Sequence, residues 1–511
     1  MEKNLIMNID WRTATCPFLE RILENGNVTN EDFFVFIDDY IDLANGKASQ
    51  LGAIAFNIFC QISFTRSECM PDFTVYRDND IDVETIMSTW CEPFCELREK
   101  YGIDPWQVWF DRCRQRGCEA WLSVRMNDTH DSDFEECTAE AFSFRSRWRE
   151  YAIGEKYGYY WKCMDYSHPD VRTHFLNYIK EQIAMYDIDA LELDFMREVF
   201  SFDYISNPDC HVIMTEFMRN VKALVDREST VKGRKIKISV RLPRDIEQCK
   251  VFGFDVEAWA AEKLVDHITV TPRWATCDDS MPVCDWKKRF PHIEIAAGVE
   301  TLLRFDDLRT ENGCTSHVDA DMVNGLSASY FSMGADQIYL YNFFWNPFDT
   351  NCDYYERTVD ILSRCGDKST ALNTSRRHVV MYQDIAPQGY NCYKPLPMVV
   401  KDGQKNVRVF TGEIPDNSNT RLRVAFSRGN PDNTRIYINS KECSNFKPCD
   451  CSALQQFNDN LFEMRFDNRA AVKVGDTVWM CDVVIENTRH ISDVTFASSD
   501  AIIDHVEIIV E

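Results

Sequence analysis

Alternating apolar and polar positions recur along most of the chain, and the most informative run extends from Ile188 to Arg197. In an extended chain, alternate side chains share a face. A buried carboxylate is costly unless it is paired or used in chemistry. The run therefore predicts a buried strand with functional acids, or alternatively a structural ion-pair network. The apolar face consists of Leu191, Leu193 and Phe195, and the acidic face consists of Ala190, Glu192 and Asp194.

Strand-like and helix-like segments alternate throughout residues 1–372, which indicates βα units around a parallel sheet. Helices are expected at Glu31–Asn45, capped by Thr29 or Asn30, and at Asp170–Met185, with Ser167 as the cap. Eight strands of this kind predict a (β/α)8 TIM barrel. The eight segments are Leu5–Asp10, Gly52–Ile58, Glu119–Arg125, Ile188–Asp194, Lys235–Arg241, His267–Thr271, His292–Ala297 and Asp336–Tyr341.

The helical periodicity stops at His378, and short alternating runs separated by turn residues follow. We predict a C-terminal all-β sandwich over residues 378–511, of jelly-roll type. Such a domain either binds sugar or buttresses the barrel, and we favour the buttress. The runs are Val407–Phe410, Arg421–Phe426, Thr434–Ile438, Asp476–Met480 and Ile502–Val510.

Composition narrows the class of protein. The 511 residues carry a net charge of −26, which disfavours nucleic acid as a partner because nucleic acid requires a basic face. No run of eighteen apolar residues predicts a membrane span. The N-terminus lacks a signal-peptide pattern, so we expect a cytoplasmic location, or a periplasmic or secreted one if a leader has been removed.

Cysteine and histidine spacing predicts no metal site. The 21 cysteines are scattered without a CxxC pair, and the 10 histidines show no ligand spacing. Buried free thiols, which behave as small apolar side chains, are the favoured interpretation of the cysteines, with disulfides as the alternative. No glycine-rich phosphate loop is present, so no cofactor is expected.

Polar residues cluster where the predicted strands end. Because the carboxyl ends of parallel strands meet at one mouth, these residues predict a single site. Several acids with two tryptophans suit glycoside hydrolysis, in which one carboxylate is nucleophile or base and another donates a proton. The expected substrate-binding set is Trp11, Arg125, Asn127, Asp128, Glu192, Arg197, Arg241, Arg273, Trp274 and Asn342, and the catalytic candidates are Asp194, Asp279 and Glu300.

The barrel half resembles the glycosyl-hydrolase-like (β/α)8 proteins of polysaccharide-degrading bacteria. The resemblance extends over roughly residues 5–345 and implies a glycosidase-like activity on an oligosaccharide or glycoside. The phrases that carry it are Trp121–Asp128, Met164–Arg172, Asp189–Arg197, Thr271–Trp274 and Gly334–Phe343.

The strand-four phrase is similar to that of the α-galactosidase clan, whose nucleophilic aspartate and arginine fall in register with Asp194 and Arg197. Glu192 replaces the lysine of that clan, and its acid follows strand six, where this chain has Asp279 and the preceding aspartate. The chitinase family has its catalytic glutamate where this chain has Met196, which disfavours the chitinase mechanism.

A third clan, with glutamates after strands four and seven, matches less well. Glu300 corresponds to its nucleophile, whereas Glu198 lies slightly beyond the strand-four position and the asparagine that precedes that clan's glutamate is missing.

We therefore expect a glycosidase with Asp194 as nucleophile or base and with Asp279, ahead of Glu300, as proton donor. Glu192 is expected to orient Arg125 or Arg241, since a buried carboxylate needs such a partner. The surplus of arginines at the mouth favours a uronic or sulfated sugar. The alternatives are a carbohydrate-binding barrel without catalysis, and a carboxylate-driven lyase or isomerase acting on sugars.

Overall fold

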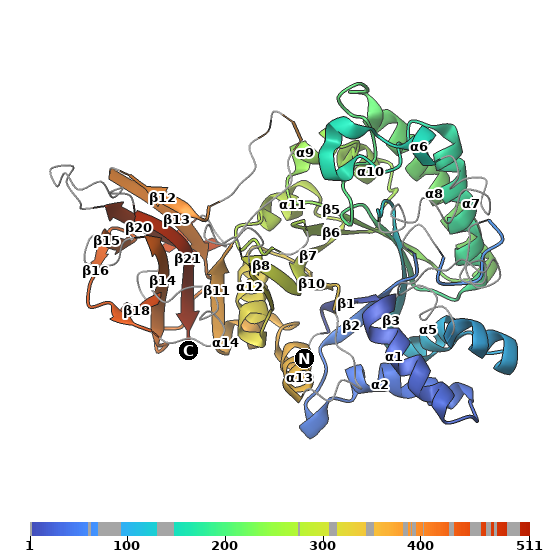
Figure 1. Cartoon of the computed structure of the whole chain (residues 1–511), viewed down its shortest axis with the longest axis horizontal. Coiled ribbons are helices and arrows are strands. Elements are labelled where there is room, and N and C mark those ends of the chain that lie inside the picture. The colour runs from blue at the N-terminus through green and yellow to red at the C-terminus, as the bar shows by residue number, and fades with distance from the viewer. Residues whose placement is uncertain are drawn as a thin grey trace.

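The computed structural model of the chain consists of a barrel and a β-sandwich that lie side by side (Figure 1). For residues 10–17, 45, 148, 304–305, 314–316, 352–355, 472, 474 and 478–479 only the backbone is described. The structure describes residues 3–59, 63–69, 93–129, 148–273, 276–305, 314–343, 352–381, 387–388, 390, 395–401, 403–428, 434–449, 461–466, 472–474, 478–487 and 501–511.

Eight parallel strands close into a barrel in the order β1-β10-β7-β6-β5-β4-β3-β2. Neighbours in sequence are therefore neighbours in space, and the predicted TIM barrel is confirmed. The strands are β1 (Leu5–Asp10), β2 (Leu51–Asn57), β3 (Glu119–Arg125), β4 (Ala190–Asp194), β5 (Lys237–Pro243), β6 (His267–Thr271), β7 (Glu294–Glu300) and β10 (Gln337–Tyr341).

The predicted strand boundaries differ from the observed ones by a few residues. The largest consequence concerns β7, which ends at Glu300, three residues later than expected. Glu300 therefore belongs to the strand itself and pairs with Tyr341 of β10. Its position on the barrel wall is set by the sheet and not by a loop.

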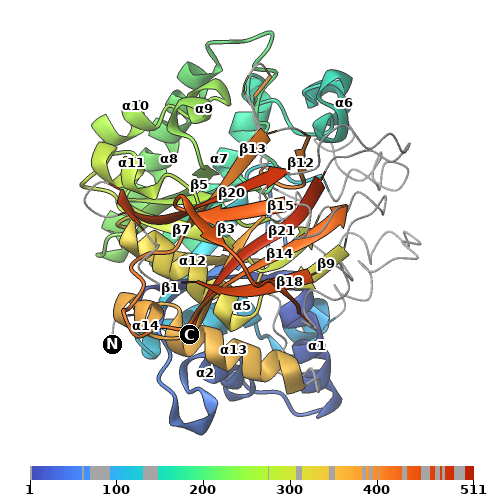
Figure 2. The ribbon, with the colours of Figure 1, turned by 90° about the vertical axis from the view of Figure 1, so that its left-hand side faces the viewer.

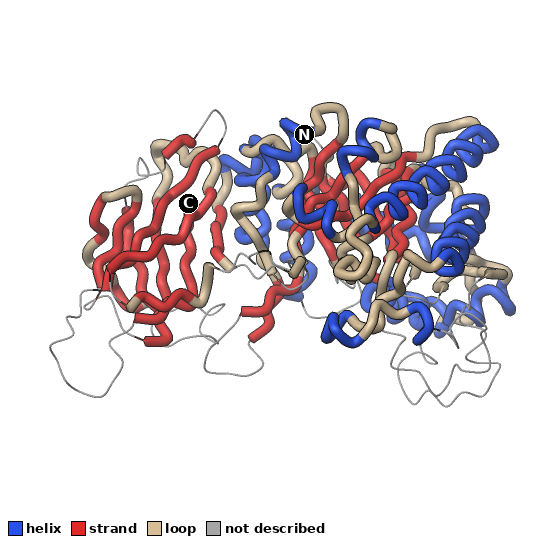
Figure 3. Tube along the Cα trace, turned by 90° about the horizontal axis from the view of Figure 1, so that it is seen from above, coloured by secondary structure: helices blue, strands red, loops and turns tan. Residues whose placement is uncertain are grey.

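Helices surround the barrel strands, as the tube view from above shows (Figure 3). The hairpin of β8 (Leu302–Phe305) and β9 (Cys314–His317) follows β7. The helices are α1 (Trp11–Glu24), α2 (Phe34–Ile41), α5 (Pro105–Gln115), α6 (Trp148–Tyr151), α7 (Pro169–Met185), α8 (Cys210–Lys232), α9 (Ile246–Val251), α10 (Val256–Ala261), α11 (Val283–Arg289), α12 (Ala320–Ser332), α13 (Cys352–Arg364) and α14 (Lys368–Asn373), with short turns η1 (Asn30–Phe33), η2 (Ala44–Gly46), η3 (Leu97–Tyr101) and η6 (Glu155–Tyr160).

Two predicted helix starts can be checked against hydrogen bonds. Thr29 caps η1 in a capping box, with its N–H donating to Asp32 at 2.7 Å, as expected. Ser167 is not the cap of α7, because its N–H donates to Asp165 and His168 takes the cap position instead.

The C-terminal strands form two antiparallel sheets, which confirms the predicted sandwich, and they face the viewer in Figure 2. A separate apolar core that includes Val407, Leu422, Val483 and Ile508 fills the sandwich. The first sheet contains β11 (Arg376–Val380), β12 (Met398–Val400), β14 (Thr420–Arg428), β17 (Lys447–Pro448), β18 (Leu461–Phe466) and β21 (Ala501–Val510), and the second contains β13 (Gly403–Phe410), β15 (Thr434–Ile438), β16 (Lys441–Cys443), β19 (Val472–Val474) and β20 (Val478–Asn487).

Helix α12 connects the barrel to the sandwich. A Cβ atom on Gly325 would lie 2.1 Å from the carbonyl oxygen of Arg377, so the absence of a side chain lets β11 pass directly against this helix. Ser329 donates a hydrogen bond to the carbonyl of Phe410 at 2.6 Å. These contacts fit a buttress, whereas the division into units 1–372 and 378–511 stays a prediction.

A buried ion-pair network strengthens the same junction. The Glu507 carboxylate contacts Arg377 at 2.8 Å and Arg423 at 2.9 Å, and Arg377 also contacts Asp319 at the start of α12. Burial raises the pKa of Glu507, but Arg377, His505 and Arg423 outweigh it and hold this pKa well below its usual range.

Two further features concern the chain as a whole. The described cysteines are free thiols and most are buried, as the sequence favoured. Within the described ranges, no helix combines the length and the apolar character that crossing a membrane requires.

Replacing Glu507 with Gln should lower the free energy of unfolding by about 3–5 kcal/mol at pH 7, because two arginines lose their buried counter-charge. A depressed pKa contributes stability above the unfolded value of about 4.3, so the deficit should shrink as the pH falls below about 4. Urea denaturation measures both effects. The exposed control Glu442→Gln, whose Arg435 partner is also exposed, should cost less than about 1 kcal/mol, and an equal loss in both variants would contradict the role of Glu507.

Candidate active site

The inward side chains of the barrel stack in layers that become charged toward the carboxyl ends of the strands. In the layer nearest the mouth, Arg125 of β3, Asp194 of β4 and Arg241 of β5 are paired in register. Neighbouring strands lie about 4.8 Å apart, so one acid lies between two arginines. The predicted inward direction of Glu192 and Asp194 is confirmed, because both contact side chains from other barrel strands.

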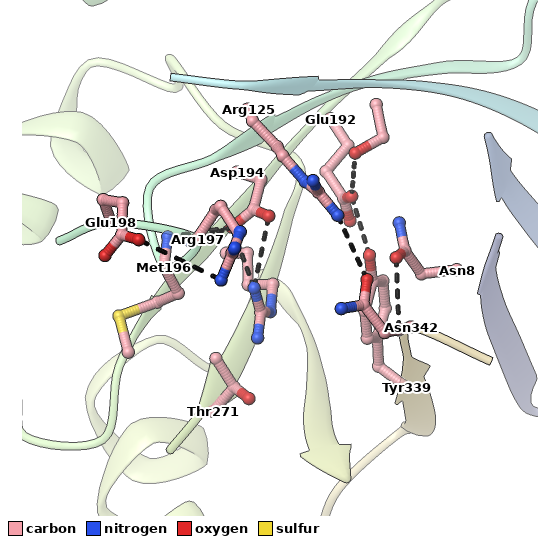
Figure 4. A network of polar contacts seen from close by, with 12 residues as sticks. Asn8, Arg125, Glu192, Asp194, Met196, Arg197, Glu198, Thr271, Tyr339 and Asn342 are labelled. Atoms are coloured by element: carbon pink, nitrogen blue, oxygen red, sulfur yellow. Dashed lines mark hydrogen bonds and ion pairs between the residues drawn. The ribbon is translucent and has the colours of Figure 1, made fainter. Parts of the chain in front are cut away.

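Asp194 is almost completely buried at the end of β4. Its Oδ1 accepts hydrogen bonds from the backbone N–H groups of Met196 at 2.8 Å and Arg197 at 3.0 Å. Both carboxylate oxygens also accept from Arg241 Nη1, at 3.0 and 3.2 Å. The carboxylate is therefore held from two sides, by the turn that follows its own strand and by the neighbouring strand (Figure 4).

Arg241 joins Asp194 to a second carboxylate. Its Nη2 donates to Glu300 Oε1 at 2.9 Å, and its guanidinium carbon lies 3.4 Å from the centre of the Tyr341 ring. Burial lowers the pKa of this guanidinium, but the charges of Asp194, Tyr341 and Glu300 together raise it above its usual value. The structure thus places Asp194 and Glu300 on one fully buried cation.

A second chain of polar contacts runs beside this pair. Arg125 donates to Asp128 at 2.9 Å and to the side-chain oxygen of Asn342 at 3.2 Å. With its amide oriented for hydrogen bonding, Asn57 accepts from the same guanidinium at 3.1 Å. Arg197 Nε lies 3.6 Å from Asp128. Asp128 is thus a carboxylate between two arginines.

Glu198 extends this chain toward the loop after β6. Its Oε2 accepts a hydrogen bond from Arg273 at 2.7 Å, and its Oε1 lies 4.0 Å from Arg197 Nη1. Arg273 also lies over the ring of Tyr160, 5.4 Å from its centre. Glu198 itself is completely buried.

Glu192 occupies the layer below Asp194 and has partners other than those predicted. Its Oε1 accepts hydrogen bonds from Ser123 and Tyr339, both at 2.7 Å, and its Oε2 accepts none from the described residues. The predicted orienting of Arg125 or Arg241 by Glu192 is therefore not made through a hydrogen bond, although the charge of Arg241 acts on the pKa of Glu192. Burial, with the charge of Asp194 as the second cause, raises the pKa of Glu192 to about 7.

Two predicted residues make hydrogen bonds with the backbone of neighbouring segments. Asn127 uses its amide on backbone groups, donating to the carbonyls of Met164 and Phe200 and accepting from Met164 N–H, so it braces loops instead of facing a ligand. Asp279 is buried against the sandwich, where it accepts from Phe410 N–H at 2.9 Å. Its contact with β13 could not be inferred from the order of residues along the barrel.

The two predicted aromatic platforms cannot be placed. Trp274 lies outside the described residues, and Trp11 begins α1 but its side chain is not described. The interaction of these rings with a sugar therefore stays a prediction.

Sequence reasoning missed several inward side chains that complete the site. Ser123, Tyr339 and Tyr341 follow the alternation of strand positions and could have been found by extending it along β3 and β10. Asn8 was hidden within an apolar run. Its side-chain oxygen accepts from the N–H of Asn342 at 3.3 Å, and the latter residue has a positive φ of 48°.

A metal-binding set is not apparent in the described part of the chain, where no three His, Cys, Asp or Glu side chains are grouped to hold an ion. The described residues of the mouth supply carboxyl groups, guanidinium groups and tyrosine hydroxyls.

No protein-family model matches the sequence, and no curated protein matches it either. Among solved structures, the chain is similar to alpha-L-fucosidase isoenzyme 2 from Paenibacillus thiaminolyticus, with a TM-score of 0.42 and 9% identity, covering 74% of this chain and 51% of that one. It is also similar to chitinase ChiW from Paenibacillus sp. str. FPU-7, with a TM-score of 0.41 and 8% identity over 95% and 52% of the two chains.

A GH27 β-L-arabinopyranosidase from Geobacillus stearothermophilus has a TM-score of 0.38 and 8% identity, covering 96% of this chain and 98% of its own. The chain spans about half the length of the first two structures. These structural neighbours are all glycoside hydrolases, but likeness at this level does not bear on the chemistry of the site.

Replacing Glu192 with Gln should stabilise the protein increasingly as the pH rises. The pKa of Glu192 is higher in the folded protein than in the unfolded chain. Below the unfolded pKa, ionisation of Glu192 does not affect the stability of the wild type, and between that pKa and about pH 7 it lowers the stability progressively. The difference in unfolding free energy should change by about 1–3 kcal/mol in favour of the variant between pH 5 and 8. Urea denaturation at both pH values measures this, with the exposed Glu216→Gln as control, and parallel pH profiles would contradict the assignment.

Proposed function

We propose that the protein is a glycoside hydrolase whose site lies at the mouth of the barrel. The observation that carries this proposal is the arrangement of Asp194 and Glu300 on the two sides of the Arg241 guanidinium. TIM-barrel enzymes hold their catalytic groups at the carboxyl ends of the barrel strands, where these two acids lie. Paired carboxyl groups are what glycoside hydrolysis requires.

Asp194 is the proposed nucleophile or base. It ends β4, and it accepts four hydrogen bonds that fix its orientation. Preorganised contacts of this kind stabilise charge without reorganisation during the reaction. Its alignment with the nucleophilic aspartate of the α-galactosidase clan agrees with this role.

Glu300 is preferred to Asp279 as the second acid of the site. Glu300 shares a cation with Asp194, whereas Asp279 accepts a backbone hydrogen bond from the sandwich. Because Arg241 is permanently charged, Glu300 is suited to the role of an anion that balances positive charge developing on the sugar.

A neutral sugar is now favoured over the uronic or sulfated sugar that the sequence suggested. The four mouth arginines already contact four carboxylates of the protein, so no surplus of positive charge supports an anionic ligand. An arginine fork binds a ligand carboxylate strongly only when it is not already used. The arginines are therefore proposed to organise the protein's own acids.

Asp194→Asn should abolish the release of chromophore from aryl glycosides, lowering kcat/KM by about 10²–10⁴-fold or more. The measurement uses a panel of α- and β-linked aryl glycosides and compares the variant with the wild type. Circular dichroism and thermal unfolding verify that the variant is folded, and Glu216→Gln on the exposed face of α8 is the matched control.

The outcomes separate the proposal from its rivals. Turnover that survives in the folded Asp194→Asn variant would contradict the role of Asp194. Binding of oligosaccharides without turnover of any aryl glycoside or polymer would favour a carbohydrate-binding barrel. A product that absorbs in the ultraviolet because it is unsaturated would indicate a lyase, and an unchanged molecular mass of the sugar would indicate an isomerase.

Arg197→Gln tests the nature of the sugar, because Arg197 has the most exposed side chain of the four mouth arginines, at 11%. We expect kcat/KM for a neutral glycoside and for the matching uronide to fall by the same factor. Hydrogen bonds to charged groups contribute about 1.5–3 kcal/mol, so a selective loss of about tenfold or more on the uronide would overturn the preference for a neutral sugar.

A further inference from the structure

Glu198 is a buried acid that has no role in the proposed pair of Asp194 and Glu300. It lies four residues after Asp194, and its side chain is completely buried. One oxygen, Oε2, accepts a hydrogen bond from Arg273 at 2.7 Å. The other, Oε1, has no hydrogen-bond partner among the described residues and lies 4.0 Å from Arg197 Nη1. A buried carboxyl oxygen without a hydrogen bond is expensive, which points to a use for that oxygen.

The turn after β4 positions this acid relative to Asp194. Asp194 Oδ1 accepts from Met196 N–H and Arg197 N–H, so the carboxylate at the strand end closes the turn that leads to Glu198. In Figure 4, Arg197 lies between the side chains of Asp194 and Glu198. The two acids are therefore located by the same short turn, and Arg197 contacts both, Asp194 through its backbone N–H and Glu198 through its guanidinium.

The groups around Glu198 favour its neutral form. Burial is the largest cause and raises its pKa, and the charge of Asp128 acts in the same direction, while Arg273 and Arg197 oppose it. Tyr160 also faces Glu198, and burial raises the pKa of this phenol to about 12. Burial likewise raises the pKa of the Cys163 thiol well above its usual value. Both of these neighbours are neutral near pH 7, so they add no charge that would ionise the acid.

The environments of Asp194 and Glu300 differ in kind from that of Glu198. Each accepts a hydrogen bond from Arg241, a cation that cannot lose its charge, and neither is the proposed proton donor. A glycosidase needs one carboxyl group that stays protonated near the working pH beside one that does not.

We propose that Glu198 is the proton donor to the leaving group, an assignment that rests on the proposed glycosidase function. As the bond between the anomeric carbon and the glycosidic oxygen breaks, its electron pair stays on that oxygen, which takes the proton of Glu198 and leaves as an alcohol. Asp194 either bonds to the anomeric carbon, in which case water then breaks that bond and gives its proton to the ionised Glu198, or takes a proton from the attacking water and later releases it to solvent. Water restores the proton of Glu198 at the end of the cycle.

The test compares two leaving groups in wild type and Glu198→Gln. An alkyl leaving group needs a proton, and a dinitrophenolate does not. We therefore expect kcat/KM for the alkyl glycoside to fall by about 10²–10⁴-fold, the contribution of a general acid, and kcat/KM for the dinitrophenyl glycoside to change far less. The isosteric amide preserves the oxygen that accepts from Arg273, and Glu216→Gln is the control for an exposed glutamate.

The pH profile is a second readout. The wild type should lose activity on the alkyl glycoside as the pH rises through the raised pKa of Glu198, because the donor is then ionised. In Glu198→Gln this basic limb should disappear from the residual activity on the alkyl glycoside, and the dinitrophenyl profile should lack it already in the wild type. If Glu198 had only a structural role, the substitution would lower kcat/KM for both substrates by the same factor and leave the basic limb in place. That result would overturn the assignment.

The failure of this inference can be told from the failure of the proposed function. If the wild type turns over glycosides, Asp194→Asn does not, and Glu198→Gln remains fully active on the alkyl glycoside, the protein is a glycosidase with another donor. If the folded wild type cleaves no aryl glycoside, alkyl glycoside or polymer, the glycosidase proposal itself fails, and the assignment of Glu198 fails with it.

Discussion

The structure of the site depends on the ion pairs that Arg241 makes inside a closed barrel. Inside this closed barrel of eight parallel strands the side chains of Asp194 and Glu300 are buried, so their carboxylates need a partner within the protein. Arg241 forms an ion pair with each of these carboxylates, and its guanidinium lies over the ring of Tyr341. Because a guanidinium is planar and has donors on more than one edge, one residue can hold two acids from two strands at once. This arrangement sets the positions of the proposed catalytic groups.

The same requirement explains the junction between barrel and sandwich. Glu507 is buried there between Arg377 and Arg423, and the first of these reaches Asp319 at the start of α12. Asp279 lies at the same junction and accepts a hydrogen bond from β13. The acids that follow the barrel strands thus divide into two groups, one that faces the mouth and one that joins the two parts of the chain. The proposed chemistry uses only the first group.

Within the mouth, position along a few residues of β4 and its turn decides the surroundings of three acids. Glu192 lies deeper, is bonded to two hydroxyl groups and has a raised pKa. Asp194 contacts a cation and two backbone N–H groups. Glu198 is buried beside two arginines and still has a raised pKa. Groups of one chemical type can therefore take opposite roles, because desolvation favours the neutral acid and a close cation favours the anion.

The sequence by itself determined the barrel, its eight strands, the all-β C-terminal part and the acidic face of β4, since these follow from periodicities of two and 3.6 residues that local backbone geometry imposes. It also placed Arg125, Asp194, Arg241 and Glu300 at one end of the sheet. Only the tertiary structure decided which acid meets which cation. Asp279 and Glu300 look equivalent along the chain, yet one contacts the sandwich and the other shares Arg241 with Asp194. Likewise, Glu192 bonds Ser123 and Tyr339 and no arginine, because pairing depends on distances across the closed barrel that no local pattern contains.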